Sequence, residues 1–181
     1  ANDVGTPLDT QLRVAFYRDG ETLVDEVTES IELAPHVVER RGVEAMLGRF
    51  VDASYAYRFG PPAFDVVVAS LERPADGGLV SQAFAFPAGR PADVQPIDSV
   101  GLNASARRVD GDVVVTITTS RLAHGVRLRV PGFAPDDDAF SIEPGRSRVI
   151  RCRSTNGMTG AGTVGALNME GVVDIVVEPS P

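Results

Sequence analysis

The chain has 181 residues, of which 43% are hydrophobic and 23% are charged, so it can form one large packed domain or two small ones. The formal net charge is −8 and all 17 basic residues are arginine. This balance argues against nucleic acid or an anionic membrane as a partner. No stretch approaches the roughly 18 consecutive apolar residues that a membrane-spanning helix requires.

The N-terminal segment has neither the basic nor the apolar region of a signal peptide. The first residues are what we expect at a boundary inside a longer polypeptide, rather than at a natural N-terminus. Cys152 is the single cysteine, which excludes an intrachain disulfide and a thiolate metal cluster. Together these features favour a cytoplasmic protein over a secreted one.

Short runs of β-branched and aromatic residues, separated by turn residues, dominate the first half of the chain. Leu12, Val14 and Phe16 alternate with other residues, which places them on one face of a strand. Asp19-Gly20 suits the positive φ angles of a tight hairpin turn, and Asp76-Gly77-Gly78 predicts a second turn. The predicted strands of this half are 12–17, 21–27, 30–33, 50–57, 65–71 and 79–86.

A short helix and a linker interrupt this pattern. Val43 to Leu47 predict one or two helical turns that end at Gly48. The proline-rich stretch from Pro87 to Pro96 lacks donors for a β-ladder and stiffens the chain, so it is the best linker candidate. We place a domain boundary near Asp93, which gives domains of residues 1–92 and 93–181.

The second half repeats the β pattern. Asp110-Gly111 and Pro144-Gly145 predict turns, and Ser154 to Gly162 predict a loop. The last run, Val172 to Val177, is dominated by apolar residues, which predicts a strand buried on both faces. The predicted strands of this half are 101–109, 113–117, 126–130, 140–142, 148–152 and 172–177.

The predicted fold class is therefore all-β, with two immunoglobulin-like β-sandwich domains in tandem. Helix should occupy less than about a tenth of the chain.

Catalytic groups are scarce in this sequence. His36 and His124 are the two residues that could act as acid or base near neutral pH, and both lie in expected loops without a Gly-x-Ser-x-Gly elbow nearby. Nothing selects one pair among the 25 carboxylates for glycosidic chemistry. We therefore expect no catalytic residue in this chain. The carboxylates considered lie on turns or at polar strand positions: Asp19, Asp110, Asp112, Glu29 and Glu32.

One acidic cluster, Asp136-Asp137-Asp138, suggests calcium, because aspartates in a loop can chelate Ca²⁺ through hard oxygens. No EF-hand spacing follows it, and a solvated acidic turn is the favoured interpretation. Gly157 to Gly165 match neither a P-loop nor a dinucleotide-binding turn. We expect neither a metal nor a cofactor.

Direct binding of sugar would require exposed aromatic platforms. The chain has no tryptophan, and its three tyrosines are Tyr17, Tyr55 and Tyr57. An independent carbohydrate-binding or adhesion-type β-sandwich module therefore stays open as an alternative, with these tyrosines side by side on a platform.

Two segments resemble a known family. The first runs from Leu47-Gly48-Arg49-Phe50 through Tyr55-Ala56-Tyr57-Arg58-Phe59-Gly60-Pro61-Pro62 to Asp65-Val66-Val67-Val68. It is similar to the immunoglobulin-like domain that follows the catalytic barrel in β-mannosidase-type enzymes of glycoside hydrolase family 2. The second, from Gly125 through Phe140 and Pro144-Gly145 to Val149, resembles their C-terminal immunoglobulin-like domain. The chain departs from the family pattern at Phe64, where a histidine is common.

The resemblance implies a parent protein that is a retaining glycoside hydrolase, with two glutamates of a (β/α)₈ barrel as catalytic residues. This chain is too short to contain that barrel, so no residue here inherits those roles. Its implied function is to pack against and stabilise an upstream barrel, its expected partner. The segment expected to make this interdomain contact holds Tyr55, Tyr57, Arg58 and Phe59, because tyrosine and arginine are enriched where protein surfaces meet. The same four residues could instead belong to a local core.

Overall fold

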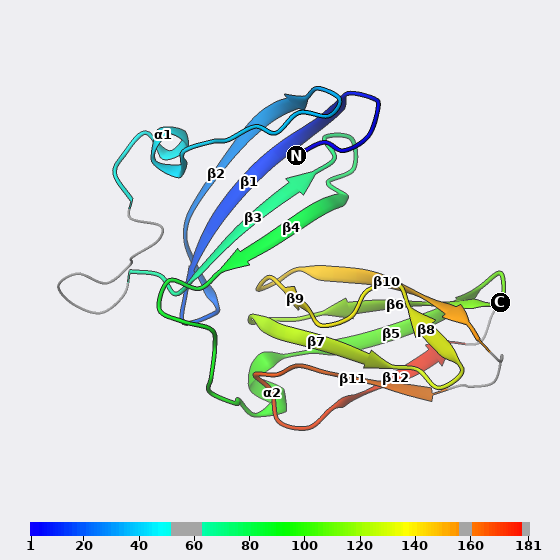
Figure 1. Ribbon diagram of the computed structural model, residues 1–181. Coiled ribbons are helices and arrows are strands. Elements are labelled where there is room, and N and C mark those ends of the chain that lie inside the picture. The colour runs from blue at the N-terminus through cyan, green and yellow to red at the C-terminus, as the bar shows by residue number, and fades with distance from the viewer. Residues whose placement is uncertain (52–62, 156–160, 179–181) are drawn as a thin grey trace. The chain divides into compact units, whose positions relative to one another are not determined.

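The computed structural model describes residues 1–51, 63–155 and 161–178, and it consists of two compact units, Ala1–Arg90 and Pro91–Pro181 (Figure 1). Of the described residues, strands hold 52% and helices 6%, which confirms the predicted all-β class and the low helix content. Within the described residues, no helix is long and apolar enough to cross a membrane.

Unit 1, residues 1–90, is built on a four-stranded antiparallel sheet with the strand order β2-β1-β3-β4. Asp19 and Gly20 have φ angles of 57° and 62°, which confirms the hairpin turn predicted between the first two strands. Gly48 ends the helix with a φ of 66°, as predicted. The elements are β1 (Leu8–Arg18), β2 (Thr22–Leu33), α1 (Val43–Leu47), β3 (Val66–Glu72) and β4 (Leu79–Ala85).

The prediction of two short strands after the first turn was wrong, since β2 is one continuous strand of 12 residues. It pairs with β1 from Thr22 opposite Arg18 to Leu33 opposite Leu8. The long partner strand keeps β2 extended through Thr28 and Glu29, where the sequence shows no apolar run. Phe50 and Val51 are not in a strand, and the rest of the predicted strand 50–57 lies outside the described residues.

One face of the unit 1 sheet is apolar. Val14 and Phe16 of β1 and Val67 of β3 form a buried cluster with Phe64. The rings of Phe16 and Phe64 meet edge to face with their centroids 4.9 Å apart. The side chains packed against this cluster include Val43, Met46 and Leu47, so α1 covers this face.

Unit 2, residues 91–181, contains an eight-stranded sheet with the order β8-β10-β6-β5-β12-β11-β7-β9. Its pairs are antiparallel except for β12 and β5, which are parallel. The predicted turn at Asp110-Gly111 is confirmed by φ angles of 50° and 86°. The elements are α2 (Ile97–Val100), β5 (Asn103–Val109), β6 (Asp112–Thr118), β7 (Ala123–Arg129), β8 (Phe133–Pro135), β9 (Phe140–Ile142), β10 (Ser147–Ser154), β11 (Ala161–Gly165) and β12 (Val173–Glu178).

The sheet of unit 2 encloses one core. Ile150 of β10 and Val126 of β7 lie near opposite ends of the strand order, yet both belong to the same cluster of buried side chains. Ile117 of β6 and Ile175 of β12 contribute from the centre of the sheet. The sheet must therefore fold over on itself, as a sandwich-type fold requires.

The prediction that the last strand is buried on both faces was wrong. Ile175 is 1% exposed, whereas its neighbour Val176 is 68% exposed and Val172 is 56% exposed. The strand has partners along both edges, β5 and β11, but only one of its faces packs on the core. Three short elements, α2, β8 and β11, were not predicted.

Candidate functional site

The other face of the unit 1 sheet carries a row of polar residues across all four strands. Arg13 of β1 lies opposite Thr28 of β2 and opposite Ser70 of β3, and Ser70 lies opposite Gln82 of β4. Directly opposed residues of antiparallel strands project to the same face. The alternation that sends Val14 into the apolar cluster therefore sends Arg13 to the opposite face, where Ala15, Val66 and Val68 are also buried.

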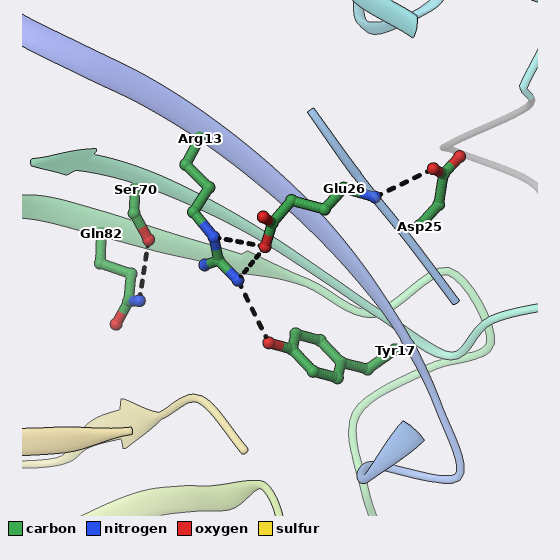
Figure 2. A network of polar contacts seen from close by, with 6 residues as sticks. All are labelled: Arg13, Tyr17, Asp25, Glu26, Ser70 and Gln82. Atoms are coloured by element: carbon green, nitrogen blue, oxygen red, sulfur yellow. Dashed lines mark hydrogen bonds and ion pairs between the residues drawn. The ribbon is translucent and has the colours of Figure 1, made fainter. Parts of the chain in front are cut away.

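Arg13 is the centre of a network of hydrogen bonds on this face (Figure 2). Its Nε donates to Glu26 Oε2 at 2.6 Å, and its Nη2 lies 2.5 Å from the same oxygen. Nη2 also donates to the hydroxyl of Tyr17 at 3.4 Å. The Arg13 side chain is 7% exposed and that of Glu26 is 39% exposed. A guanidinium this deeply buried requires such partners, because an unpaired buried charge is costly.

Two further polar contacts lie near this network. Gln82 Nε2 donates to the hydroxyl of Ser70 at 2.9 Å, and the Glu26 N–H donates to Asp25 Oδ1 at 2.9 Å. Figure 2 shows these contacts above and beside the Arg13 guanidinium. Since Glu26 is held in an ion pair by Arg13, this face suits recognition and packing better than acid–base catalysis.

Tyr17 lies within this network and is only 4% exposed. It therefore offers no exposed ring for stacking on a sugar. Tyr55 and Tyr57, the other two tyrosines considered for such a platform, lie outside the described residues.

The segment predicted to make an interdomain contact also lies outside the described residues, so Tyr55, Tyr57, Arg58 and Phe59 keep the status of a prediction. Phe64, where the family pattern often has a histidine, is 7% exposed and packs on Phe16. At this position the chain has a core residue.

The two histidines lie far apart in the chain and in different units. His36 is exposed and has a positive φ of 58°. The Nδ1 of His124 lies 2.9 Å from the hydroxyl of Ser141. The backbone N–H of His124 donates to Asn168 Oδ1 at 2.8 Å, and the amide of Asn168 donates to the carbonyl of Leu122 at 2.8 Å. The bonds of Asn168 hold its loop against the start of β7, and the imidazole of His124 contacts β9.

The acidic cluster in unit 2 contacts arginines and backbone amides. Asp136 Oδ1 accepts a hydrogen bond from the N–H of Arg151 at 3.2 Å. Asp137 accepts a hydrogen bond from the guanidinium of Arg148, whose guanidinium carbon lies 4.7 Å from the ring centroid of Phe140. Among the described residues, no group of three or more His, Cys, Asp or Glu side chains could hold a metal ion.

The other carboxylates considered lie in turns, in pairs with arginine or at exposed positions. Asp19 and Asp110 take positive φ angles in the hairpin turns, and Glu29 lies 3.4 Å from Arg41. Glu32 is an exposed residue of β2. Asp112 accepts the N–H of Ser154 at 3.0 Å and Nε of Arg151 at 2.7 Å. These bonds, the backbone one first, lower the pKa of Asp112.

The thiol of Cys152, the single cysteine, is not in a reactive form. Cys152 is 0% exposed, and burial, with smaller contributions from Asp136 and Asp112, raises the pKa of its thiol to about 11. The thiol therefore stays protonated near neutral pH, whereas the thiolate is the form that attacks or binds metal.

Sequence reasoning missed the Arg13 network. The available signal was the spacing of Arg13 and Tyr17, which places both on the strand face opposite Val14 and Phe16. What the sequence did not show is that Glu26 of the next strand reaches the same guanidinium. That contact depends on the register of β1 and β2.

No protein-family model matches the chain, and no curated protein matches it. Solved structures do. The β-D-mannosidase from Dictyoglomus thermophilum matches with a TM-score of 0.62 at 15% identity, over 94% of this chain and 20% of that enzyme. Two structures of CsxA, an exo-β-D-glucosaminidase and a variant of the Amycolatopsis orientalis exo-chitosanase, match with TM-scores of 0.58 at 13% identity. Each covers 97% of this chain and 24% of the longer one.

At these identities the comparisons establish likeness of fold. The chain spans about a fifth to a quarter of the length of the enzymes that it matches. Nearly all of this chain thus has the fold of one part of larger glycoside hydrolases.

Proposed function

We propose that this chain is a non-catalytic C-terminal accessory region of a β-mannosidase-like glycoside hydrolase, where it packs against and stabilises a catalytic barrel of the same polypeptide. The observation that carries the proposal is the asymmetry of the structural matches. They cover 94–97% of this chain but 20–24% of the matched enzymes. This asymmetry supports a role as one region of a larger enzyme. The resemblance to glycoside hydrolase family 2 indicates that the partner of this region is the catalytic barrel.

The chemistry of the described residues agrees with this proposal. Glu26, Asp112 and Asp137 all have arginine or backbone partners, and the Cys152 thiol is buried and protonated. A (β/α)₈ barrel takes about 250 residues, more than the whole chain. The catalytic groups of the parent enzyme would therefore lie in another part of the polypeptide.

The first experiment is an activity assay of the 181-residue chain. We expect no release of chromophore from an aryl β-mannoside or an aryl β-glucosaminide, even at high protein concentration. Saturable turnover that disappears when one Asp or Glu is replaced would contradict the proposal, since a self-standing hydrolase needs a carboxylate pair.

The second experiment tests the accessory role directly. The coding sequence upstream of Ala1 should encode a barrel with two suitably placed glutamates. In that longer protein, deletion of residues 1–181 should lower the melting temperature of the barrel. A start codon immediately before Ala1, or a barrel of unchanged stability, would reject the role.

The predicted contact segment has its own test. If Tyr57 contacts the barrel, Tyr57→Ala should destabilise the longer protein and leave the isolated chain unchanged. An equal loss of stability in both proteins would instead assign Tyr57 to a local core.

Calorimetry with manno-oligosaccharides separates the proposal from an independent carbohydrate-binding module. We expect no binding by the isolated chain, because Tyr17, one of three tyrosines available for a platform, is buried. Millimolar or tighter binding that is abolished by Tyr55→Ala or Tyr57→Ala would favour the binding module.

A further inference from the structure

The two outer strands of the unit 1 sheet differ in charge. β2 carries four carboxylates, and charged side chains are a common means of preventing unwanted pairing at a sheet edge. β4 and the next residue, Leu79 to Phe86, contain no charged residue, no proline and no glycine. The carboxylates of β2 are Asp25, Glu26, Glu29 and Glu32.

The uncharged strand is also exposed. Leu79 and Val80 are 38% and 41% exposed, and Ser81, Ala83 and Ala85 are exposed as well. In the described part of the chain, β4 pairs with β3 and with no other strand. Backbone N–H and C=O groups on its outer edge can therefore pair with a further strand.

A second copy of the same strand fits this edge. In antiparallel pairing about a two-fold axis, a strand lies against a copy of itself, so each charge on it lies near the same charge of the second copy. β4 has no such charge, whereas β2 would bring its carboxylates together. With a net charge of −8 for the whole chain, an uncharged edge is the favourable place for two copies to meet.

We propose that β4 pairs antiparallel with β4 of a second copy of this chain, so that two four-stranded sheets become one sheet of eight strands. A two-fold axis at Gln82 would place Val80 opposite Phe84 and Leu79 opposite Ala85, which are aliphatic, aromatic or small side chains throughout. An interface of one strand pair is smaller than the roughly 1,200 Å² of stable complexes. The dimer is therefore weak and depends on concentration.

Sedimentation velocity of the full chain over a wide range of concentration tests this pairing. Ala83→Lys places a charge on each copy at the edge, so we expect the dissociation constant to rise by at least about 100-fold. Ser30→Lys adds the same charge to an exposed position of β2 and should leave the dissociation constant within about threefold of the original. A chain that stays monomeric at every concentration would overturn the proposal, as would equal effects of the two variants.

Cross-linking gives a second test of the pairing. It uses cysteine variants, so it still applies if the lysine variants do not fold. Gln82 lies on the proposed two-fold axis near the middle of β4, so Gln82→Cys would face the same residue of the second copy, and the native Cys152 is buried. Under mild oxidation we expect Gln82→Cys to form a disulfide-linked dimer and Ser30→Cys, at an exposed position of β2, to remain monomeric. Cross-linking of both variants to the same extent, or of neither, would refute pairing through β4.

Discussion

The two units bury their apolar side chains in different ways. Unit 2 folds an eight-stranded sheet around one cluster, to which Ile117, Ile150 and Ile175 all contribute. Unit 1 has a four-stranded sheet with an apolar face around Phe16, and the opposite face carries the network of Arg13. A sheet that closes around a core covers the core side of its strands, whereas the outer strands of a four-stranded sheet keep edges for other contacts.

This difference matters for function. The described part of unit 2 is held together by a shared apolar core. Unit 1 combines a buried polar network around Arg13 with an uncharged outer strand, and the outer strand is the feature suited to association. Substitutions in each unit can test whether the comparison holds.

The largest effect should come from Phe16→Ala in unit 1. Phe16 is 1% exposed and packs edge to face on Phe64, so its truncation should cost about 3–5 kcal/mol of unfolding free energy. Hydrogen exchange should then show loss of protection in β1 and β3 and retained protection in β6 and β10. The exposed control Leu23→Ala should change little. Equal loss of protection in the strands of both units would show that their cores are not separate.

A pair of neighbours in β12 tests the core of unit 2. Ile175→Ala should cost about 2–5 kcal/mol, because Ile175 is 1% exposed. Val176→Ala should lie within about 0.5 kcal/mol of the original, because Val176 is 68% exposed. Urea denaturation measures both. Similar losses for the two variants would restore the prediction that this strand is buried on both faces.

Local sequence patterns were sufficient to predict much of the fold. Alternation of Leu12, Val14 and Phe16 located β1, and the Asp-Gly pairs at Asp19 and Asp110 located two hairpins, because positive φ angles restrict the choice of residue. These signals need only a few consecutive residues. They do not report which neighbours cover a strand.

The errors arise where distant residues decide the outcome. β2 stays extended through Thr28 because β1 pairs with it along its whole length. β8 has three residues, Phe133–Pro135, and is a strand because β10 pairs with it. The candidate site shows the same limit, since Arg13 lies at a polar position of an alternating strand and its partner Glu26 is set by strand register.

Arg13 provides the third test, with an effect smaller than those of the core residues. Arg13→Ala removes the bonds to Glu26 and Tyr17 and should cost about 1.5–3 kcal/mol, the range for hydrogen bonds to charged groups. Arg13→Lys should recover part of this loss, because lysine keeps the charge without the planar fork. Arg18→Ala, at the exposed end of β1, is the matched control. Thermal denaturation measures both variants. Equal losses of stability for Arg18→Ala and Arg13→Ala would show that the Arg13 network does not stabilise unit 1.

The smallest effects should come from two carboxylates with lowered pKa values, one in each unit. The pKa of Asp76 in unit 1 is lowered first by a hydrogen bond from the Arg73 guanidinium and then by the N–H of Gly78. The pKa of Asp112 in unit 2 is lowered first by the N–H of Ser154 and then by the Arg151 guanidinium. A lowered pKa in the folded state means that the stabilisation is complete above the unfolded-state pKa of about 3.9 and disappears as pH falls through the folded-state pKa.

Both Asp76→Ala and Asp112→Ala should therefore be less stable than the original chain at pH 7 and should converge with it in acid. Salt separates the two carboxylates. An exposed ion pair is screened by salt, whereas a hydrogen bond from a backbone amide is screened less. In about 1 M salt, where the Debye length is about 3 Å, the effect of Asp76→Ala should shrink more than that of Asp112→Ala. Urea denaturation at pH 7 with and without salt measures both effects, and equal salt sensitivity would mean that the arginines dominate in both units.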